Sequence, residues 1–250
     1  MAASRPTGTV CWVDLSTPDP QAGGRFYRDL LGWQVSTADT PMGPYSIGET
    51  GGGPVAGLMA PAPDAADAPP GWTVFFAVDD LDHAWDRAAE AGANGLQPPL
   101  EVPGGSRIAA VTDPAGAVVG LMQPAAEAAM AFGEPGAVCW VEAQRRDLAT
   151  TSAFYRALLG WAAREGSGGY WLFEQGGEAV GGLMAMPAEV PEEVPSYWLL
   201  YFGVDDVEHT CTRASELGGA VLVPTMRVEE QCFAVLADPP GAAFGVLQVR

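Results

Sequence analysis

The chain has 250 residues and a formal net charge of −19, from 12 basic and 31 acidic side chains. Hydrophobic residues make up 48% and charged residues 17%, which is typical of a globular chain with a substantial core. Such an acidic field repels phosphates, so nucleic acid and anionic membranes are poor partners. All 12 basic residues are arginines, which excludes a lysine Schiff-base enzyme and a standard P-loop NTPase.

The sequence favours a cytoplasmic protein that acts as a monomer or a homodimer. The first residues, MAASRPTG, precede no apolar stretch, so we expect no signal peptide, and no apolar run approaches the length that spans a membrane. The cysteines form no CxxC pair and are too sparse for a secreted disulfide framework. We therefore expect four reduced, mostly buried thiols, at Cys11, Cys139, Cys211 and Cys232.

The first sixty or so residues predict a strand, a helix and three further strands. Residues 9–15 alternate and are rich in strand formers. Asp19 followed by Pro20 is typical of a helix N-cap and first helical position, and Gly32 is a typical helix end. Three short strands follow, separated by glycine-rich turns, over residues 33–37, 45–49 and 54–60.

The same order of elements follows at once in the chain. Residues 72–78 predict a strand, and residues 81–91 predict a helix that ends at Gly92. Three more strands complete this second βαβββ repeat. The sequence VVGLM at residues 118–122 resembles VAGLM at residues 55–59, which supports two related repeats in this half of the chain.

The second half of the chain repeats the first. VCWVD at residues 10–14 returns as VCWVE at residues 138–142, and LLGW at residues 30–33 returns at residues 158–161. The motif FYR and the pair Asp-Pro also recur. The sequence therefore predicts two modules, over residues 1–124 and 136–250, joined by a linker over residues 125–135. Each module contains two βαβββ repeats.

Four βαβββ repeats in tandem resemble the vicinal oxygen chelate superfamily, the glyoxalase, bleomycin-resistance protein and dioxygenase group. The resemblance lies in the run from Asp19 to Gly32, in VDD at residues 78–80 and in DPAG at residues 113–116, which all have counterparts in the second module. The first strands also resemble an actinobacterial two-module subgroup labelled "hydroxylase" or "27 kDa antigen-like". The resemblance implies an α+β fold in which curved mixed sheets form cups, and a small-molecule ligand.

The resemblance also implies where a metal would bind. Members of the superfamily typically hold a divalent ion in the cup with His, Gln or Glu side chains from the first and last strands of the repeats. The matching positions here carry no usual ligand: they are Trp12, Gly57, Thr73, Gly120, Trp140, Gly182, Leu199 and Gly245. His83 and His209 follow predicted helix starts, so we expect them on helices outside the cup. We therefore expect no metal and no other cofactor.

Other side chains would then line the cups. If Trp12 points inward, strand alternation also turns Asp14 inward, and Trp140 and Glu142 repeat this arrangement. The carboxylates either meet a polar ligand or cap turns and pair with an arginine, and Arg107 is the expected partner of Asp14. Glycines at the carboxylate positions would leave space. The candidate ligand-binding residues are Trp12, Asp14, Met59, Thr73, Phe75, Arg107, Met122, Trp140, Glu142, Met184, Tyr201 and Cys232.

Three functions remain open at this point. The sequence favours a binding protein that holds a small, partly aromatic molecule in a metal-free cup. The first alternative is a lyase or a dioxygenase/hydroxylase of the same superfamily, with Asp14 or Glu142 as a base or with the metal held in another way. The second alternative is an interaction protein whose cups are filled core. No catalytic residue is identified.

Overall fold

The computed structural model describes residues 6–126, 129–186, 190 and 194–249. The elements of the first half are β1 (Val10–Ser16), α1 (Pro20–Leu31), β2 (Gln34–Thr40), β3 (Gly43–Thr50), β4 (Gly53–Met59), the 3-10 turn η1 (Pro63–Ala65), β5 (Gly71–Ala77), α2 (Leu81–Glu90), β6 (Asn94–Glu101), β7 (Arg107–Thr112) and β8 (Val118–Gln123). Those of the second half are β9 (Val138–Arg145), α3 (Leu148–Leu159), β10 (Ala162–Glu165), the turn η2 (Ser167–Gly169), β11 (Trp171–Gln175), β12 (Glu178–Ala185), β13 (Tyr197–Val204), α4 (Val207–Glu216), β14 (Ala220–Val228), β15 (Gln231–Ala237) and β16 (Ala243–Gln248).

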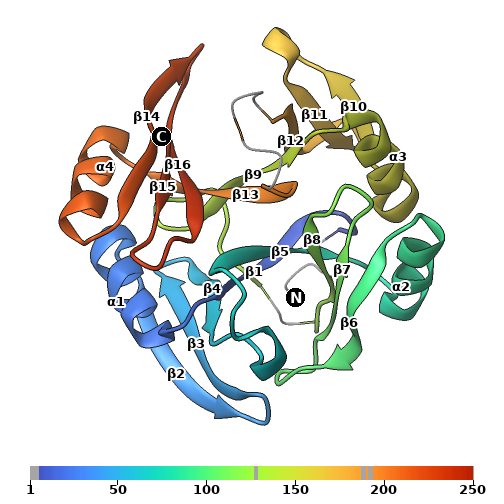
Figure 1. The fold of residues 1–250 in the computed structure, drawn as a ribbon, viewed down its shortest axis with the longest axis horizontal. Helices are drawn as coiled ribbons and strands as arrows, with labels where there is room; N and C mark the ends of the chain where they lie inside the picture. Colours follow the sequence, from blue (N-terminus) through green and yellow to red (C-terminus); the bar gives the residue numbers. More distant parts are fainter. Residues whose placement is uncertain (1–5, 127–128, 187–189, 191–193, 250) are drawn as a thin grey trace. The chain divides into compact units, whose positions relative to one another are not determined.

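The strands form two eight-stranded mixed sheets, with the orders β2-β3-β4-β1-β5-β8-β7-β6 and β10-β11-β12-β9-β13-β16-β15-β14 (Figure 1). In each βαβββ repeat the first strand pairs in parallel with the last one, and the last three strands form antiparallel pairs. The predicted α+β class and the four repeats are confirmed. Among the described residues, no helix is long and apolar enough to cross a bilayer.

The described chain forms two compact units, and each takes one repeat from each half of the sequence. In the first compact unit α2 lies beside α3, and this unit comprises Met1–Cys11, Val74–Ala129 and Val141–Trp198 (Figure 1). In the second compact unit α1 lies beside α4, and this unit comprises Trp12–Thr73, Met130–Trp140 and Leu199–Arg250. The boundaries of the two sequence modules remain a prediction from the repeat, and residues 127 and 128 of the predicted linker lie outside the described part.

The helix ends follow the chemistry of their capping residues. The side chain of Asp19 accepts a hydrogen bond from the backbone N–H of Ala22, and Pro20 is the first residue of α1. Gly32 ends the helix with φ of 77°, a left-handed conformation that glycine adopts without strain. Both predictions for this helix are confirmed. The strand predicted over residues 33–37 begins after Trp33, because β2 starts at Gln34. Trp33 itself is a buried core residue.

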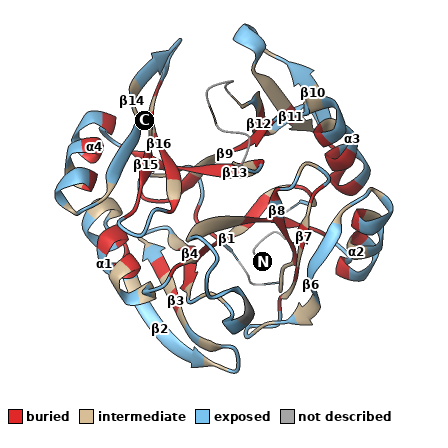
Figure 2. Cartoon of the chain, in the orientation of Figure 1, coloured by how far each residue is buried: buried red, intermediate tan, exposed pale blue. Residues whose placement is uncertain are grey.

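An aromatic cluster fills the core of the second compact unit. Tyr27 is fully buried and stacks on Trp33, with ring centroids 5.1 Å apart. The indole N–H of Trp33 donates to the carbonyl oxygen of Gly136 at 2.7 Å. The first compact unit repeats the pattern with Tyr155 and Trp161, whose ring centroids lie 5.2 Å apart. Burial of these rings stabilises the fold. The central strands β5 and β13 are largely buried, whereas the edge strands β2 and β6 are largely exposed (Figure 2).

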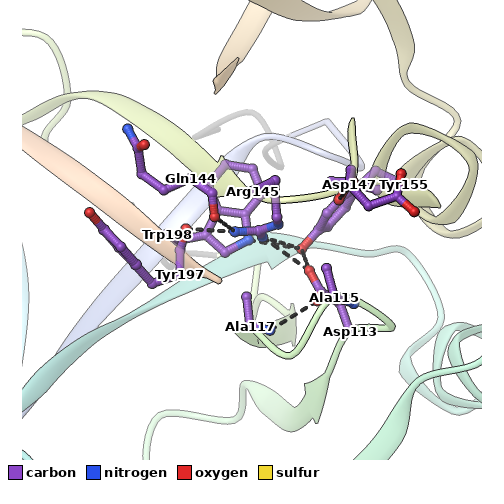
Figure 3. Close-up of polar contacts among 10 residues, drawn as sticks. Asp113, Ala115, Ala117, Gln144, Arg145, Asp147, Tyr155, Tyr197 and Trp198 are labelled. Atoms are coloured by element: carbon purple, nitrogen blue, oxygen red, sulfur yellow. Dashed lines mark hydrogen bonds and ion pairs between the residues drawn. The ribbon is translucent and has the colours of Figure 1, made fainter. Parts of the chain in front are cut away.

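The first compact unit also contains a fully buried ion pair. Arg145 and Asp113 lie 3.0 Å apart, and their side chains are 0% and 1% exposed. Asp113 also accepts hydrogen bonds from Tyr155 Oη and from the backbone N–H groups of Ala115 and Ala117 (Figure 3). The carboxylate therefore fixes the turn before β8 and neutralises Arg145, so both charges are compensated.

The second compact unit lacks this cation. Asp238 takes the place of Asp113 there, and it accepts backbone N–H groups from Gly241 and Ala242 and a bond from Tyr27 Oη at 3.3 Å. A buried threonine, Thr17, precedes α1 where Arg145 precedes α3. Burial raises the pKa of Asp238, although the hydrogen bonds from Ala242, Gly241 and Tyr27 oppose this rise.

Replacement of Asp113 by asparagine tests the ion pair. Asp113→Asn keeps the shape of the side chain but leaves the guanidinium of Arg145 buried without a counter-charge. We expect the free energy of unfolding, measured by urea denaturation, to fall by about 3–5 kcal/mol. The exposed pair of Arg28 and Asp29 provides the control, since Asp29→Asn should change stability little. Equal effects of the two substitutions would contradict this account of the core.

Candidate functional site

Strand β1 turns alternate side chains to opposite faces of its sheet. Val13 and Leu15 are fully buried, and a Cβ built on Gly23 of α1 would contact Leu15 and Leu58. These apolar side chains therefore face the helix. Trp12 and Asp14 alternate with them and lie on the opposite face of the sheet. The predicted common orientation of Trp12 and Asp14 is consistent with the fold.

Three side chains on this face form one hydrogen-bonded group, the Asp14 cluster, which consists of Trp12, Asp14 and Tyr45. The phenol of Tyr45 donates to Asp14 Oδ1 at 2.5 Å. The indole N–H of Trp12 lies 2.9 Å from the same oxygen and 2.8 Å from Tyr45 Oη, so it is shared between them. Asp14 is 5% exposed, whereas Trp12 and Tyr45 are half-buried.

The cluster depends on a glycine in the neighbouring strand. Gly57 of β4 lies in register with Asp14 of β1. A Cβ at Gly57 would overlap both Tyr45 Oη and Asp14 Oδ1. Any larger residue would therefore separate the phenol from the carboxylate. Met59, two residues on, lies in register with Tyr45 and borders the cluster.

Burial controls the protonation of the cluster. Loss of hydration raises the pKa of Asp14 from its usual 3.8 to about 6, although the bonds from Tyr45 and Trp12 oppose this rise. Burial and the nearby charge of Asp14 also raise the pKa of Tyr45, so this phenol stays protonated and acts as a donor. The cluster therefore presents a carboxylate that changes charge near neutral pH.

The second module has a different carboxylate group at the matching place. Glu142 of β9 is 6% exposed and lies in register with Gly182 of β12. It accepts a hydrogen bond from the side-chain amide of Gln144. Burial and the charge of Glu142 raise the pKa of Tyr197. Trp140 is half-buried. A glutamine amide thus stands beside the carboxylate of Glu142.

The predicted pair of Arg107 and Asp14 is wrong. Both terminal nitrogens of Arg107 lie 2.9 Å from the carboxylate of Asp82 on α2. Arg107 lies in register with Gln123, whose side chain accepts the backbone N–H of Leu81 at the start of α2. Both side chains therefore face the helix. The sequence alone did not fix the register of this strand. A one-residue change in register moves every side chain of a strand to the opposite face, so the predicted orientation of Arg107 was reversed.

Cys232, the counterpart of Arg107, also faces the helix. It is buried, and it contributes, after burial itself, to the raised pKa of Cys211 on α4. Its neighbour Phe233 instead contacts the ring of Tyr201, with centroids 6.3 Å apart. Two of the predicted ligand-binding residues, Arg107 and Cys232, thus lie on the helix side of their sheets.

The remaining predicted residues lie on or beside the glycine-bearing strands. The ring of Phe75 covers Gly120, and the ring of Tyr201 covers Gly245, since a Cβ at either glycine would overlap the ring. The expectation that these glycines leave space is therefore wrong: large neighbouring side chains fill it. Met122 is buried, and the side chains of three further candidates are half-buried, namely Met59, Thr73 and Met184.

Tyr45 and Gln144 were missed by the sequence comparison. Tyr45 lies in an antiparallel hairpin whose ladder shifts between Gly48 and Glu49. Because a shift of one residue reverses the face of a strand residue, the sequence alone does not show that Tyr45 reaches Asp14. A tyrosine at the start of a predicted strand is the one signal that was available.

The donor set at the superfamily's metal positions does not fit a divalent ion. Trp12 and Trp140 place indoles at these positions, rings cover Gly120 and Gly245, and the Tyr45–Asp14 pair fills the space above Gly57. Within the described ranges, no group of three or more His, Cys, Asp and Glu side chains could hold a metal. His83 and His209 are exposed on α2 and α4, as predicted.

Comparisons with known proteins agree with the fold. Residues 9–121 match the family model of the glyoxalase/bleomycin resistance protein/dioxygenase superfamily, and residues 140–247 match that of a glyoxalase-like domain. The solved Mn(II)-bound glyoxalase from Novosphingobium aromaticivorans is similar, with a TM-score of 0.70, 15% identity, and coverage of 97% of this chain and 82% of that one. The 2,3-dioxygenase LapB from Pseudomonas sp. KL28 has a TM-score of 0.65 and 14% identity, over 98% and 93% of the two chains. At these identities the likeness shows the fold alone.

Two curated relatives are more similar in sequence. The "Putative glyoxylase CFP32" of Mycobacterium tuberculosis is 36% identical over 252 residues, which cover 96% of this chain and 95% of the relative. The "Anthracycline biosynthesis protein DnrV" of Streptomyces peucetius is 33% identical over 260 residues, which cover 97% and 94%. The chain therefore belongs to the glyoxalase/bleomycin resistance protein/dioxygenase superfamily.

Proposed function

We propose that the protein binds a small, partly aromatic molecule at the Asp14 cluster, without a divalent metal. The observation that carries this proposal is the hydrogen-bonded group of indole, phenol and carboxylate at two of the matched metal positions, Trp12 and Gly57. A ligand would place its flat apolar part against the rings and a polar group at the carboxylate. This arrangement uses the face of the sheet on which the superfamily holds its metal, with different chemistry.

The packing of the rings supports this proposal. Trp33 and Trp72 contact several other aromatic rings in the core of the second compact unit. Trp12 and Tyr45 meet through a hydrogen bond, but in the described part of the chain neither ring packs against another aromatic ring, and both side chains are half-buried. Their apolar surface is therefore not used by the aromatic core. The relative named for anthracycline biosynthesis also favours a small-molecule ligand.

A catalytic role for Asp14 is the second candidate. A carboxylate with a pKa of about 6 is suited to accept a proton from a bound molecule near neutral pH. The raised pKa and the relative named as a glyoxylase favour this candidate. Recovery of the ligand unchanged after prolonged incubation would favour a binding protein, whereas its conversion would favour an enzyme.

A comparison of two tryptophan variants tests the binding site. We expect Trp12→Ala to weaken binding of aromatic probes about tenfold, because it removes a stacking surface. Trp33→Phe, a core substitution, should lower thermal stability and leave affinity unchanged. The probes are naphthol and dihydroxyanthraquinone, with affinities from titration calorimetry on folded protein. If neither probe binds the wild-type protein, or if Trp12→Ala leaves affinity intact, the proposed site is wrong.

Metal analysis tests the second part of the proposal. We expect protein purified without chelator to contain far less than one equivalent of Fe, Mn, Ni, Zn or Co by mass spectrometry. Dialysis against a chelator should leave the melting temperature and probe affinity unchanged, because the donor set lacks metal ligands. A stoichiometric metal whose removal abolishes binding would overturn the proposal.

The raised pKa of Asp14 predicts a stability cost. The folded state disfavours the ionised carboxylate, so the contribution of Asp14 to stability falls as pH rises from about 4 to about 6 and is then constant. We expect Asp14→Asn, which keeps an acceptor for Tyr45 and Trp12, to be more stable than wild type by about 3 kcal/mol at neutral pH. This gain should vanish near pH 4.

Urea denaturation at a series of pH values measures this effect. Asp29→Asn is the control, because Arg28 lowers the pKa of Asp29 and its substitution should have the opposite pH trend. A difference between Asp14→Asn and wild type that does not change with pH would show that Asp14 is not buried as described.

A further inference from the structure

The two oxygens of Asp14 have different surroundings. Both donors of the cluster, the phenol of Tyr45 and the indole of Trp12, end on Oδ1. No donor from the described residues reaches Oδ2. A buried carboxylate normally has several donors or a cation, because loss of hydration is expensive. Asp14 thus has one oxygen fixed by two rings and one oxygen left for another partner.

The chain shows elsewhere how it compensates a buried carboxylate. Asp113 has the guanidinium of Arg145, two backbone N–H groups and a phenol. No arginine among the described residues forms an ion pair with Asp14, and no nearby charge contributes to its pKa. The negative charge of Asp14 therefore has no arginine partner among the described residues, unlike that of Asp113.

The rings next to Asp14 also suit a cation. Trp12 and Tyr45 reach the carboxylate through Nε1–H and Oη–H, which lie in the planes of their rings. Their π faces are not used by these bonds or by contacts with other described aromatic rings. A cation over the face of an indole or a phenol is attracted by the negative face of the ring. An indole, a phenol and a carboxylate together form the chemistry that recognises ammonium groups.

The net negative charge of the chain also favours a cationic ligand. The net charge of −19 concentrates cations near the surface and repels anions. This long-range field favours every cation equally, so it provides no selectivity by itself. Selectivity for a particular cation requires the local carboxylate and rings of the Asp14 cluster.

We infer that the ligand of the Asp14 cluster carries a protonated amine, which pairs with Asp14 Oδ2 while its aromatic part lies against Trp12 and Tyr45. This inference rests on the proposed function and adds the chemical class of the ligand. The amine takes the position of the missing counter-charge. Neutral and anionic molecules with the same aromatic part bind less tightly.

Matched probes test the inference. The amines are benzylamine, naphthylmethylamine and anthracenylmethylamine, and each is compared with the alcohol that replaces its amino group by hydroxyl. Affinities are measured by titration calorimetry with wild-type protein, Asp14→Asn and the control variant Asp29→Asn. The control removes one acidic charge from the exposed face of α1 and leaves the cluster intact.

The expected result is an amine affinity at least tenfold above that of the matched alcohol in wild type and in Asp29→Asn. This ratio should fall to about one in Asp14→Asn. Asp14 and Tyr45 are the titratable groups of the cluster, and Tyr45 stays protonated. Amine binding should therefore weaken about tenfold between pH 7 and pH 5, as Asp14 takes up a proton, while alcohol binding should change little.

The outcomes that contradict the inference are distinct. Equal affinities of amine and alcohol in wild type overturn the amine class but leave aromatic binding at the cluster intact. A preference for amines that persists in Asp14→Asn assigns selectivity to net charge and also overturns the inference. Failure of every amine and every alcohol to bind wild-type protein overturns both this inference and the proposed function.

Discussion

The close approach of Tyr45 to Asp14 is possible because position 57 has no side chain. Gly57 lies in register with Asp14, and even a methyl group there would overlap the phenol and the carboxylate. The same constraint recurs where Phe75 covers Gly120 and where Tyr201 covers Gly245. Glycines in the last strands of the repeats therefore let large side chains from neighbouring strands lie flat on the sheet. What the superfamily uses as a metal-ligand position is here a contact point for rings.

The interactions that stabilise the fold are distinct from the side chains at the candidate site. The fold needs the aromatic cores around Tyr27 and Tyr155 and the turns formed by Asp113 and Asp238, and none of these depends on a metal. The face that carries Asp14 can therefore change its chemistry without loss of the core. Because one fold hosts many reactions and binders, the residues on that face, rather than family membership, have to carry the argument for function.

The two buried carboxylates Asp113 and Asp14 have opposite electrostatic surroundings. Asp113 is neutralised by Arg145, and this pair holds a turn in the core. Asp14 has no such cation, and its raised pKa means that the ionised form destabilises the folded protein. A loss of folding stability next to two half-buried rings is typical of a binding site, since a ligand can supply the cation that Asp14 lacks.

Much of this molecule follows from local sequence. The repeated motifs predict the βαβββ order, Asp19 and Gly32 predict the ends of α1, and alternation in β1 places Trp12 and Asp14 on one face, because capping and strand alternation are short-range effects. The contacts of Arg107, the reach of Tyr45 and the pairing of Arg145 with Asp113 were decided by tertiary structure. Hairpin register and bulges determine which face Arg107 and Tyr45 occupy, and a one-residue shift reverses the answer. Arg145 and Asp113 meet because a compact unit combines repeats from both halves of the chain, a long-range arrangement that no local pattern encodes.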